Sequence, residues 1–272
     1  MKLAVTGAGE AREAYAYTGG KSFDARQPCV VFIHGALHDH SVWTLAARWF
    51  AHHGHAALAP DLPGHGRSVG APLASVEALA DWLLALLDAA GIASASLVGH
   101  SMGSLIALEA AARAPGRVRH LLMVGTASPM KVSPALLDAA RTDPLAAIDS
   151  VNTFSHATLA AKPAYPGPGA WLHGGDRALM RRMQATQRET NLFVNDFEAC
   201  DRYRGGLPAA ARIACPVTFV LGTRDQMTQP TQAGELATAL RARVVTLPCG
   251  HALMSEAPDG VLGAVRDAIA AR

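Results

Sequence analysis

Charged residues, cysteines and long apolar segments are all scarce in this sequence, and each shortage excludes a class of protein. Only 17% of the 272 residues are charged whereas 50% are hydrophobic, which is too apolar for an intrinsically disordered chain. The formal net charge is +2 and lysine and arginine are scattered, so the basic patch typical of nucleic-acid-binding proteins is missing. We therefore expect one large domain, or one domain with an insertion, and no nucleic-acid partner.

No segment predicts a membrane span or an export signal. The most apolar stretch, residues 79–98, is interrupted by Asp81 and Asp88, and the apolar run at the N-terminus ends at Thr6. The cysteines show no Cys-x-x-Cys spacing, so they predict neither a zinc site nor a thioredoxin-type motif. They are Cys29, Cys200, Cys215 and Cys249. We expect a cytoplasmic protein with reduced thiols and no membrane partner.

Short β-type runs alternate with helical patterns along most of the chain. This alternation predicts an α/β fold with a mostly parallel central sheet flanked by helices. An opening hairpin is expected on either side of Gly7-Ala8-Gly9, and Ser41 is the expected N-cap of the first helix. The other expected strands cover residues 29–34, 56–59, 96–98, 118–124, 217–221 and 244–247. The expected helices cover residues 41–53, 75–90, 102–114, 231–241 and a segment from about 259.

The alternation stops between residues 128 and 212. Only helical patterns and a Pro/Gly-rich loop at 163–169 remain there, and the segment is too long for an ordinary loop. We therefore predict a helical cap, or lid, at 128–212, inserted after the strand at 118–124. Residues 1–127 and 213–272 would then form the core domain.

A glycine-flanked serine lies where an expected buried strand meets a helix. The run Gly99-His100-Ser101-Met102-Gly103 would place the serine on a sharp turn, with its hydroxyl above the edge of the sheet. Such a turn crowds its neighbours, so a Cβ atom two positions away on either side would clash. The five-residue pattern alone is weak, but its strand–turn–helix context makes Ser101 a strong candidate nucleophile.

With these residues the chain resembles the α/β-hydrolase family over almost its whole length, the insertion being the least certain part. The order serine, aspartate, histidine along the chain is the one this fold uses. Further segments carry the resemblance: His34-Gly35 with Trp43 after it, Asp61-Leu62-Pro63-Gly64-His65-Gly66-Arg67-Ser68, Gly222-Thr223-Arg224-Asp225, and Gly250-His251. The resemblance implies an α/β-hydrolase fold, no cofactor and a small-molecule substrate.

The chemistry explains why serine needs these partners. A serine hydroxyl is a poor nucleophile until a neighbouring imidazole takes its proton, and His251 is the candidate base. Asp225 would accept the other ring N–H and stabilise the imidazolium. The family sometimes keeps its acid after the preceding strand, but residues 125–128 contain no carboxylate.

The resemblance also implies two backbone donors for the oxyanion. One is the N–H of Met102 at a helix N-terminus, and the other is the N–H of Ala36, with Leu37 as the nearby alternative. His34 is expected to brace this loop. Candidate substrate-binding residues near the rim are Leu37, Met130, Met227 and Met254, although the methionines could equally fill gaps in the core.

Other histidine and glycine patterns predict no further site. The run His34-x-x-x-His38-Asp39-His40 resembles a metallo-hydrolase pattern, but Leu37 occupies the position of its second histidine, so no metal is expected. We expect His38 and His40 on an exposed loop, and His156 and His173 at the surface of the insertion. The opening glycines do not match a dinucleotide-binding fingerprint, whose third glycine is replaced by Arg12.

The sequence therefore favours a serine hydrolase acting on a carboxylic ester, thioester or lactone with a modest apolar acyl or aryl group. Carbon–carbon bond hydrolysis of a ring-cleavage product is the runner-up, although Ala252 stands where such enzymes commonly have tryptophan. Arg181, Arg182 or Arg188 could then bind a substrate carboxylate. A peptidase is less favoured, since the insertion has no marked acidic cluster. A non-hydrolytic ligand-binding protein is the alternative from another class, and the oligomeric state stays open.

Overall fold

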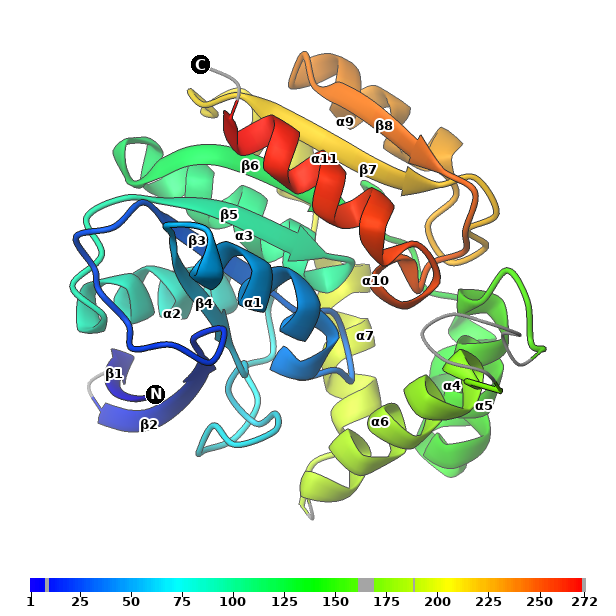
Figure 1. Ribbon diagram of the computed structural model, residues 1–272. Helices are drawn as coiled ribbons and strands as arrows, with labels where there is room; N and C mark the ends of the chain where they lie inside the picture. The colour runs from blue at the N-terminus through cyan, green and yellow to red at the C-terminus, as the bar shows by residue number, and fades with distance from the viewer. Residues whose placement is uncertain (8–9, 161–168, 188, 271–272) are drawn as a thin grey trace.

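Eight strands form one sheet through the centre of the molecule, in the order β1-β2-β4-β3-β5-β6-β7-β8 (Figure 1). The computed structural model describes residues 1–7, 10–160, 169–187 and 189–270. Strands β3 to β8 pair in parallel, whereas β1 and β2 form an antiparallel hairpin that joins the sheet through β4. The expected mostly parallel α/β sheet is confirmed, including the opening hairpin, although residues 8 and 9 lie outside the described part of the chain.

The elements lie close to the ranges that the sequence patterns predict. The strands are β1 (Lys2–Gly7), β2 (Glu10–Tyr17), β3 (Cys29–Ile33), β4 (Ala56–Pro60), β5 (Ala95–His100), β6 (Val118–Val124), β7 (Val217–Gly222) and β8 (Arg243–Leu247). The helices that alternate with them are α1 (Thr44–His52), α2 (Val76–Ala89), α3 (Met102–Arg113), α9 (Gly234–Ala239), α10 (Leu253–Glu256) and α11 (Pro258–Ala270).

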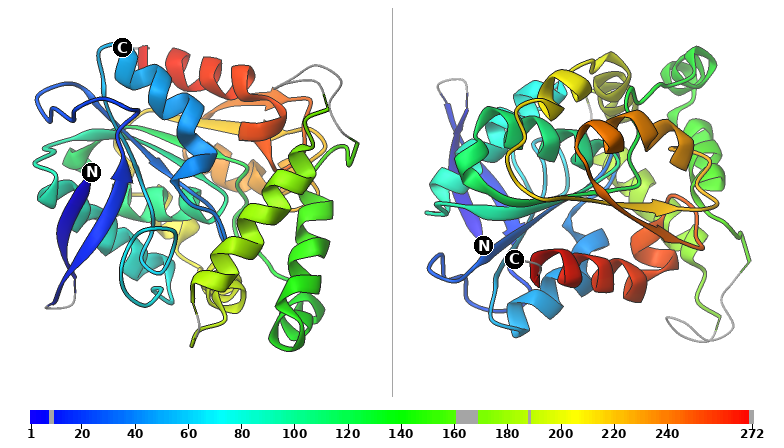
Figure 2. Two further views of the ribbon diagram at one scale, coloured as in Figure 1. Left: turned by 60° about the horizontal axis from the view of Figure 1, so that its bottom comes forward. Right: turned by 90° about the horizontal axis from the view of Figure 1, so that it is seen from above.

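Successive residues of β3 point into two apolar clusters on opposite faces of the sheet. Val30 and Phe32 pack with side chains of α1 and α11, whereas Val31 and Ile33 pack with those of α2 and α3. The alternation follows from the two-residue period of a strand. The right-hand view of Figure 2 shows α1 and α11 together on one side of the sheet. Because helices cover both faces of the sheet, both sides of the central strands are buried, and their sequences are therefore continuous apolar runs.

The first helix begins differently from the sequence prediction. Asp39 accepts a hydrogen bond from the backbone N–H of Ser41 at 2.9 Å, so a 3₁₀ helix at His40–Trp43 starts there and α1 follows it. Asp39, not Ser41, is therefore the cap, because its carboxylate reaches the free N–H two residues on. At α2 the cap is Ser75, whose side chain accepts from the N–H of Ala78.

The segment between β6 and β7 carries its own group of helices. They are α4 (Pro134–Thr142), α5 (Pro144–Ser155), α6 (Leu172–Thr186), α7 (Leu192–Arg202) and α8 (Gly206–Ala210). Helices α4 to α7 lie beyond the carboxyl ends of the parallel strands (Figure 1). Their apolar side chains form a separate cluster that also takes in Leu37 from the core. We propose that 128–212 acts as a cap; residues 163–168 of its Pro/Gly-rich loop lie outside the described residues.

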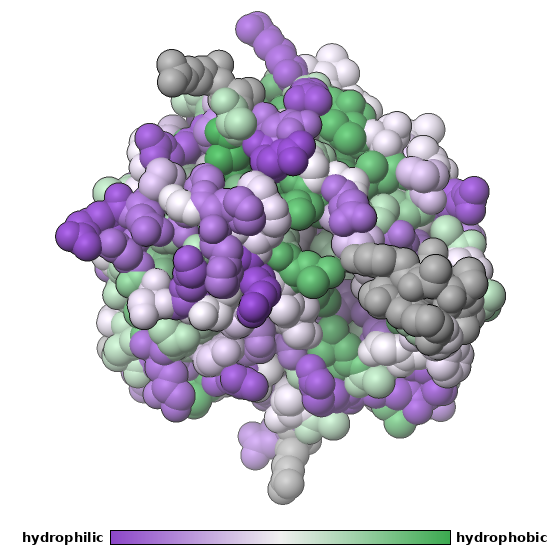
Figure 3. Space-filling model, in the orientation of Figure 1, coloured by the Kyte–Doolittle hydropathy of each residue, from purple (hydrophilic) through white to green (hydrophobic). Residues whose placement is uncertain are grey.

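The surface displays both hydrophilic and apolar residues. On the face in Figure 3, hydrophilic residues are spread widely and apolar residues show in small groups between them. Among the described residues, no helix is both long and apolar enough to cross a membrane.

Candidate active site

Ser101 occupies a strained turn between β5 and α3. Its backbone has φ +51° and ψ −120°, and its N–H donates to the carbonyl of Val124 at 2.9 Å. A side chain at Gly99 would overlap the carbonyl oxygen of Gly103, and one at Gly103 would overlap the backbone of Ile33. Both glycines are therefore required by close approach of backbone to backbone, as the sequence reasoning expected.

This crowding predicts the effect of adding one methyl group. We expect Gly99→Ala to lower the free energy of unfolding by about 1–3 kcal/mol or more, because backbone atoms have to move. Gly263→Ala is the matched control: it lies within α11 with no atom within 4 Å of an added Cβ, so it should be neutral or stabilising. Urea unfolding followed by circular dichroism measures both. Equal stabilities of the two variants would contradict the packing argument.

Asp225 and His251 meet above the ends of β7 and β8. Nδ1 of His251 lies 2.8 Å from Oδ2 of Asp225, and both side chains are buried. Burial alone would raise the pKa of Asp225, but the charge of His251 and hydrogen bonds from His251 and Thr228 hold that pKa below its ordinary value. The carboxylate therefore stays ionised and fixes the tautomer with a proton on Nδ1.

Thr228 is a part of this arrangement that the sequence reasoning missed. Its backbone N–H and its hydroxyl each donate to Asp225 at 2.8 Å, and the N–H of Met227 donates to the same carboxylate at 2.8 Å. The threonine hydroxyl is also 3.1 Å from Nδ1 of His251. The turn Asp225-x-x-Thr228, in which a side chain caps the backbone that follows, was the available signal.

Ser101 and His251 line one cavity of about 60 Å³ between core and cap. No hydrogen bond joins Ser101 to His251 in the described structure; such contacts often tighten only when substrate is bound. The cavity is smaller than the ~300–1,000 Å³ typical of ligand sites. The lining is mostly apolar: Ala36, Met130, Val132, Val151, Met180, Phe197, Cys200 and Met227, with His38, His100, Lys131, Ser155 and Thr228.

The loop after β3 carries the two candidate oxyanion donors, the backbone N–H groups of Ala36 and Leu37. The N–H of Leu37 donates to Oδ2 of Asp196 at 3.0 Å, so it is already occupied. The N–H groups of Ala36 and Met102 donate to no acceptor within the described ranges. Of the two candidates on this loop, Ala36 is therefore the one available to an oxyanion, and Met102 begins α3, where the helix dipole favours negative charge.

The four predicted substrate-binding residues separate into two pairs. Met130 and Met227 line the cavity. Leu37 is fully buried, with φ +56°, and packs into the apolar cluster of the cap. Met254 packs against the cluster under α1 and α11. Only the first pair is brought to the cavity.

Several histidines are more enclosed than the sequence suggested. Nδ1 of His34 lies 2.8 Å from the carbonyl of Gly35 and its Nε2 accepts from the N–H of Leu62, so it braces the loop. Burial lowers the pKa of this ring to about 4. The expectation of exposure is wrong for His38 and His40, because Asp176 and Asp61, which are distant in sequence, lie beside them. It is also wrong for His156, which is buried with its Nδ1 2.9 Å from the carbonyl of Asn152.

A buried ion pair joins the cap to the core beside this loop. Nε2 of His65 is 2.9 Å from Oδ2 of Asp196 in α7, and each side chain is 2% exposed. Burial would lower the pKa of His65, but Asp196 raises it above its ordinary value. Burial would likewise raise the pKa of Asp196, but the charge and hydrogen bond of His65 hold it below its ordinary value.

These shifts predict how stability changes with pH. The raised pKa of His65 stabilises the fold fully below about pH 6.5, and this contribution is lost as pH rises through the raised value. The lowered pKa of Asp196 contributes above about pH 3.9 and is lost as pH falls. The decrease in unfolding free energy caused by His65→Gln should therefore be larger at pH 5.5 than at pH 8.5. Urea titrations at several pH values measure it, and a loss that grew with pH would contradict the assignment.

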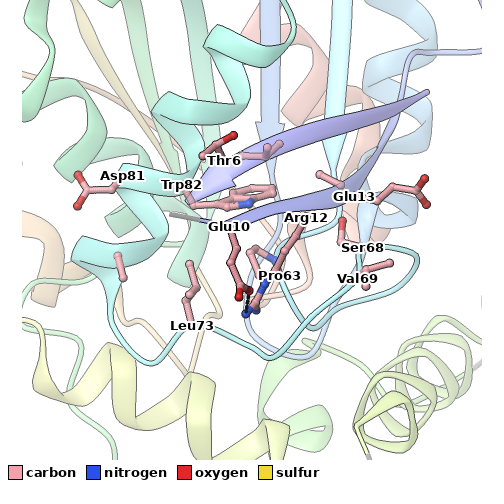
Figure 4. A pocket seen from close by; sticks show the side chains of 13 residues that line it. Thr6, Glu10, Arg12, Glu13, Pro63, Ser68, Val69, Leu73, Asp81 and Trp82 are labelled. Carbon is pink, nitrogen blue, oxygen red and sulfur yellow. Dashed lines mark hydrogen bonds and ion pairs between the residues drawn. The ribbon is translucent and has the colours of Figure 1, made fainter. Parts of the chain in front are cut away.

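A larger cavity, of about 680 Å³, lies between the opening hairpin, α2 and the loop after β4 (Figure 4). Glu10 and Arg12 face each other there at 3.3 Å, with Trp82 close by. Its one serine, Ser68, accepts from the N–H of Tyr15 and donates to a backbone carbonyl, and no histidine or cysteine lines the described cavity. Size alone therefore does not identify the candidate active site, because Ser101 and His251 line the smaller cavity.

One acidic cluster has the spacing of a cation site. Ligand atoms of Asp39, His40 and Asp61 lie within 4.8 Å of one another. Asp61 already accepts from the N–H of His40 and lies 2.7 Å from its ring, and Asp39 accepts from Arg182 at 2.9 Å. These protein contacts account for the cluster, and the absence of a metal stays a prediction.

The arginines considered for a substrate carboxylate are engaged elsewhere. Arg181 binds Asp149 at 2.7 Å and Arg182 binds Asp39. Neither lines the cavity, and Arg188 lies outside the described residues.

Comparisons with known proteins agree with this fold. A family model described as the alpha/beta hydrolase family matches residues 30–264. The chain is 27% identical to an sn-1-specific diacylglycerol lipase of Mus musculus, over 91% of this chain and 82% of the relative. It is 31% identical to a pimeloyl-[acyl-carrier protein] methyl ester esterase of Chromobacterium violaceum, over 74% of this chain and 75% of the relative. The enol-lactonase structure from Burkholderia xenovorans LB400 has a TM-score of 0.79 and 25% identity, with both chains fully covered.

Proposed function

The chain belongs to the alpha/beta hydrolase family of enzymes, and from this premise we propose that it is a serine hydrolase with a Ser101–His251–Asp225 triad. Its substrate is a carboxylic ester, thioester or lactone with a small, mostly apolar acyl or aryl group. The observation that carries the proposal is the buried His251–Asp225 pair, 2.8 Å apart, on the same cavity as the strained Ser101.

The first half of the reaction forms an acyl-enzyme. His251 Nε2 takes the proton of Ser101 as Oγ attacks the carbonyl carbon, and the N–H groups of Ala36 and Met102 stabilise the resulting oxyanion. Asp225 stabilises the imidazolium. His251 then gives the proton to the leaving oxygen or sulfur, and the bond to the leaving group breaks.

The second half returns the enzyme to its starting state. Water enters the leaving-group position, loses a proton to His251 and attacks the acyl carbon. The same two N–H donors stabilise the second tetrahedral intermediate. Its collapse releases the acid, and Ser101 regains the proton from His251.

The cavity lining supports an apolar substrate body. Met130, Met180 and Met227 present flexible thioethers, and Phe197 adds an aromatic face. The three similar proteins named above are a diacylglycerol lipase, a methyl ester esterase and an enol-lactonase, which suits an acyl-transfer reaction at this site.

Covalent labelling with a fluorophosphonate tests the activated serine. We expect one adduct per chain by intact mass, mapped to the peptide that contains Ser101 and absent from His251→Ala and from denatured protein. Absence of an adduct in the native protein would contradict the proposal. The site would then be better explained as a binding pocket or a disarmed descendant, the alternative from another class.

Carbon–carbon hydrolysis has less support. Ala252 follows the histidine, and Arg181 and Arg182 are paired with aspartates away from the cavity. An ester hydrolase and a carbon–carbon bond hydrolase would both be labelled at Ser101, so turnover of an aryl butyrate is the measurement that separates them.

A further inference from the structure

One imidazole in the cavity has no part in the triad. His38 lies two residues after Ala36 and lines the same cavity as Ser101. Its Nε2 is 2.9 Å from Oδ1 of Asp176 in α6, and the two side chains are only 12% and 9% exposed. Because a carboxylate only accepts hydrogen bonds, Nε2 of His38 carries the hydrogen.

The other ring nitrogen of His38 is left without a partner. Nδ1 is buried and forms no hydrogen bond within the described chain. An unsatisfied buried polar atom costs stability, so such an atom at a cavity marks a place where a ligand atom would be favourable. Among the other polar side chains of the wall, the hydroxyls of Ser155 and Thr228 already donate to Val151 and Asp225, and Lys131 is exposed.

His100 presents a second nitrogen of the same kind. Its Nε2 is 2.9 Å from the carbonyl oxygen of His251, so Nε2 carries the hydrogen and Nδ1 can only accept while the ring is neutral. Burial holds the pKa of His100 well below its ordinary value, which keeps the ring neutral. Nδ1 of His100 is also buried and has no hydrogen-bond partner among the described residues. The centroids of the His100 and His38 rings are 6.1 Å apart.

The chemistry of these two atoms selects the group that fits between them. Burial would raise the pKa of Asp176, but His38 lowers it, so this buried carboxylate is ionised and pairs with His38. Nδ1 of His100 accepts, and Nδ1 of His38 is the unpartnered nitrogen of a ring whose Nε2 donates to Asp176. A hydroxyl group can pair with either nitrogen, because it both donates and accepts. A carboxylate cannot donate to His100, and a methyl group pairs with neither.

We infer that His38 and His100 bind a hydroxyl group on the acyl part of the substrate, so that esters of hydroxy acids are the preferred class. The acyl part is assigned because His38 belongs to the oxyanion loop of Ala36, whereas the leaving group departs beside His251, from which it takes its proton. The inference rests on the proposed hydrolase function. It makes His38 a specificity residue and Asp176 the positioning residue that holds its ring.

The test compares matched aryl esters of butyric, 2-hydroxybutyric and 3-hydroxybutyric acids. After correction for their hydroxide-catalysed rates, we expect one hydroxy ester to exceed the butyrate in kcat/KM by about tenfold, the upper range for one hydrogen bond. In His38→Gln the amide can still donate to Asp176 but nothing stands at the Nδ1 position, so the ratio should fall to about one. His38→Asn keeps a polar group near Nδ1 and should retain part of the preference.

A control separates binding from cap attachment. Arg182→Gln removes another contact between cap and core, the 2.9 Å pair with Asp39, outside the cavity. It should leave the ratio of the two esters unchanged. If Arg182→Gln abolished the preference, or His38→Gln retained it, the assignment to His38 would be overturned.

A binding measurement makes the inference independent of turnover. In Ser101→Ala protein, calorimetry should show the hydroxybutyrate acid binding about tenfold more tightly than butyrate, with the difference lost when His38→Gln is added. Equal binding and equal kcat/KM would overturn the hydroxyl site while leaving the hydrolase intact. A retained binding preference without turnover of any ester would support the hydroxyl site and contradict the hydrolase.

Discussion

Ser101→Ala should lower kcat/KM for a short-chain aryl ester by at least about 10⁴-fold, with His251→Ala close behind. The alanine has no atom that could form the acyl-enzyme, and without His251 nothing takes the proton of the hydroxyl. Because the two residues act as a unit, the double variant should lose no more than the worse single variant. Initial rates, with circular dichroism to verify folding, measure the effect.

An exposed serine that does not line the cavity provides the control. Ser133 is exposed at the start of α4 and its side chain makes no capping hydrogen bond, so Ser133→Ala should retain full activity. Turnover that survived in Ser101→Ala would contradict the triad. Ligand binding without any hydrolysis, in wild type and variant alike, would instead support the non-hydrolytic alternative.

Asp196→Ala should lower the free energy of unfolding by about 3–5 kcal/mol, the range for removing one partner of a buried ion pair. The variant leaves His65 and the N–H of Leu37 without the carboxylate that binds them at 2.9 and 3.0 Å. Because Leu37 adjoins Ala36, we also expect the oxyanion loop to loosen and kcat to fall. Urea denaturation and ester kinetics on the same preparation measure both.

Two companion variants test the cause. Asp196→Asn keeps an oxygen that can accept from the backbone, so it should lose less stability than the alanine variant. Asp138 of α4 is 73% exposed and pairs with Arg141, and an exposed pair of this kind adds little, so Asp138→Ala should be nearly neutral. A loss as small in Asp196→Ala as in Asp138→Ala would show that the buried pair does not join cap to core.

Local sequence patterns were sufficient for the fold. The strand at Val118–Val124 has the predicted bounds, because an apolar run depends on residues a few positions apart. The start of the first helix differs from the prediction. Ser41 has the right residue type for a cap, but Asp39 lies where its carboxylate reaches the free N–H, and a pattern of residue types does not show that choice.

The candidate site was predictable where a motif carries it. Gly99 and Gly103 around Ser101 describe a backbone constraint, so the sequence itself places the nucleophile on its turn. Asp225 and His251 follow successive strands of a parallel sheet, whose carboxyl ends share one edge, so their meeting was expected. Their roles stay predictions until the labelling and kinetic experiments are done, as do the cap boundaries at 128 and 212.

What the sequence determined by itself was therefore the mostly parallel α/β architecture, the serine turn and the order of the three candidate catalytic residues, because each depends on short-range patterns. Only the tertiary structure decided the partners that lie far apart in the chain: Asp176 beside His38, 138 residues away, and Asp196 beside His65, 131 residues away. Such pairs depend on how the cap folds back onto the core. No local pattern encodes that packing, because the energy of a buried charge is set by whatever surrounds it.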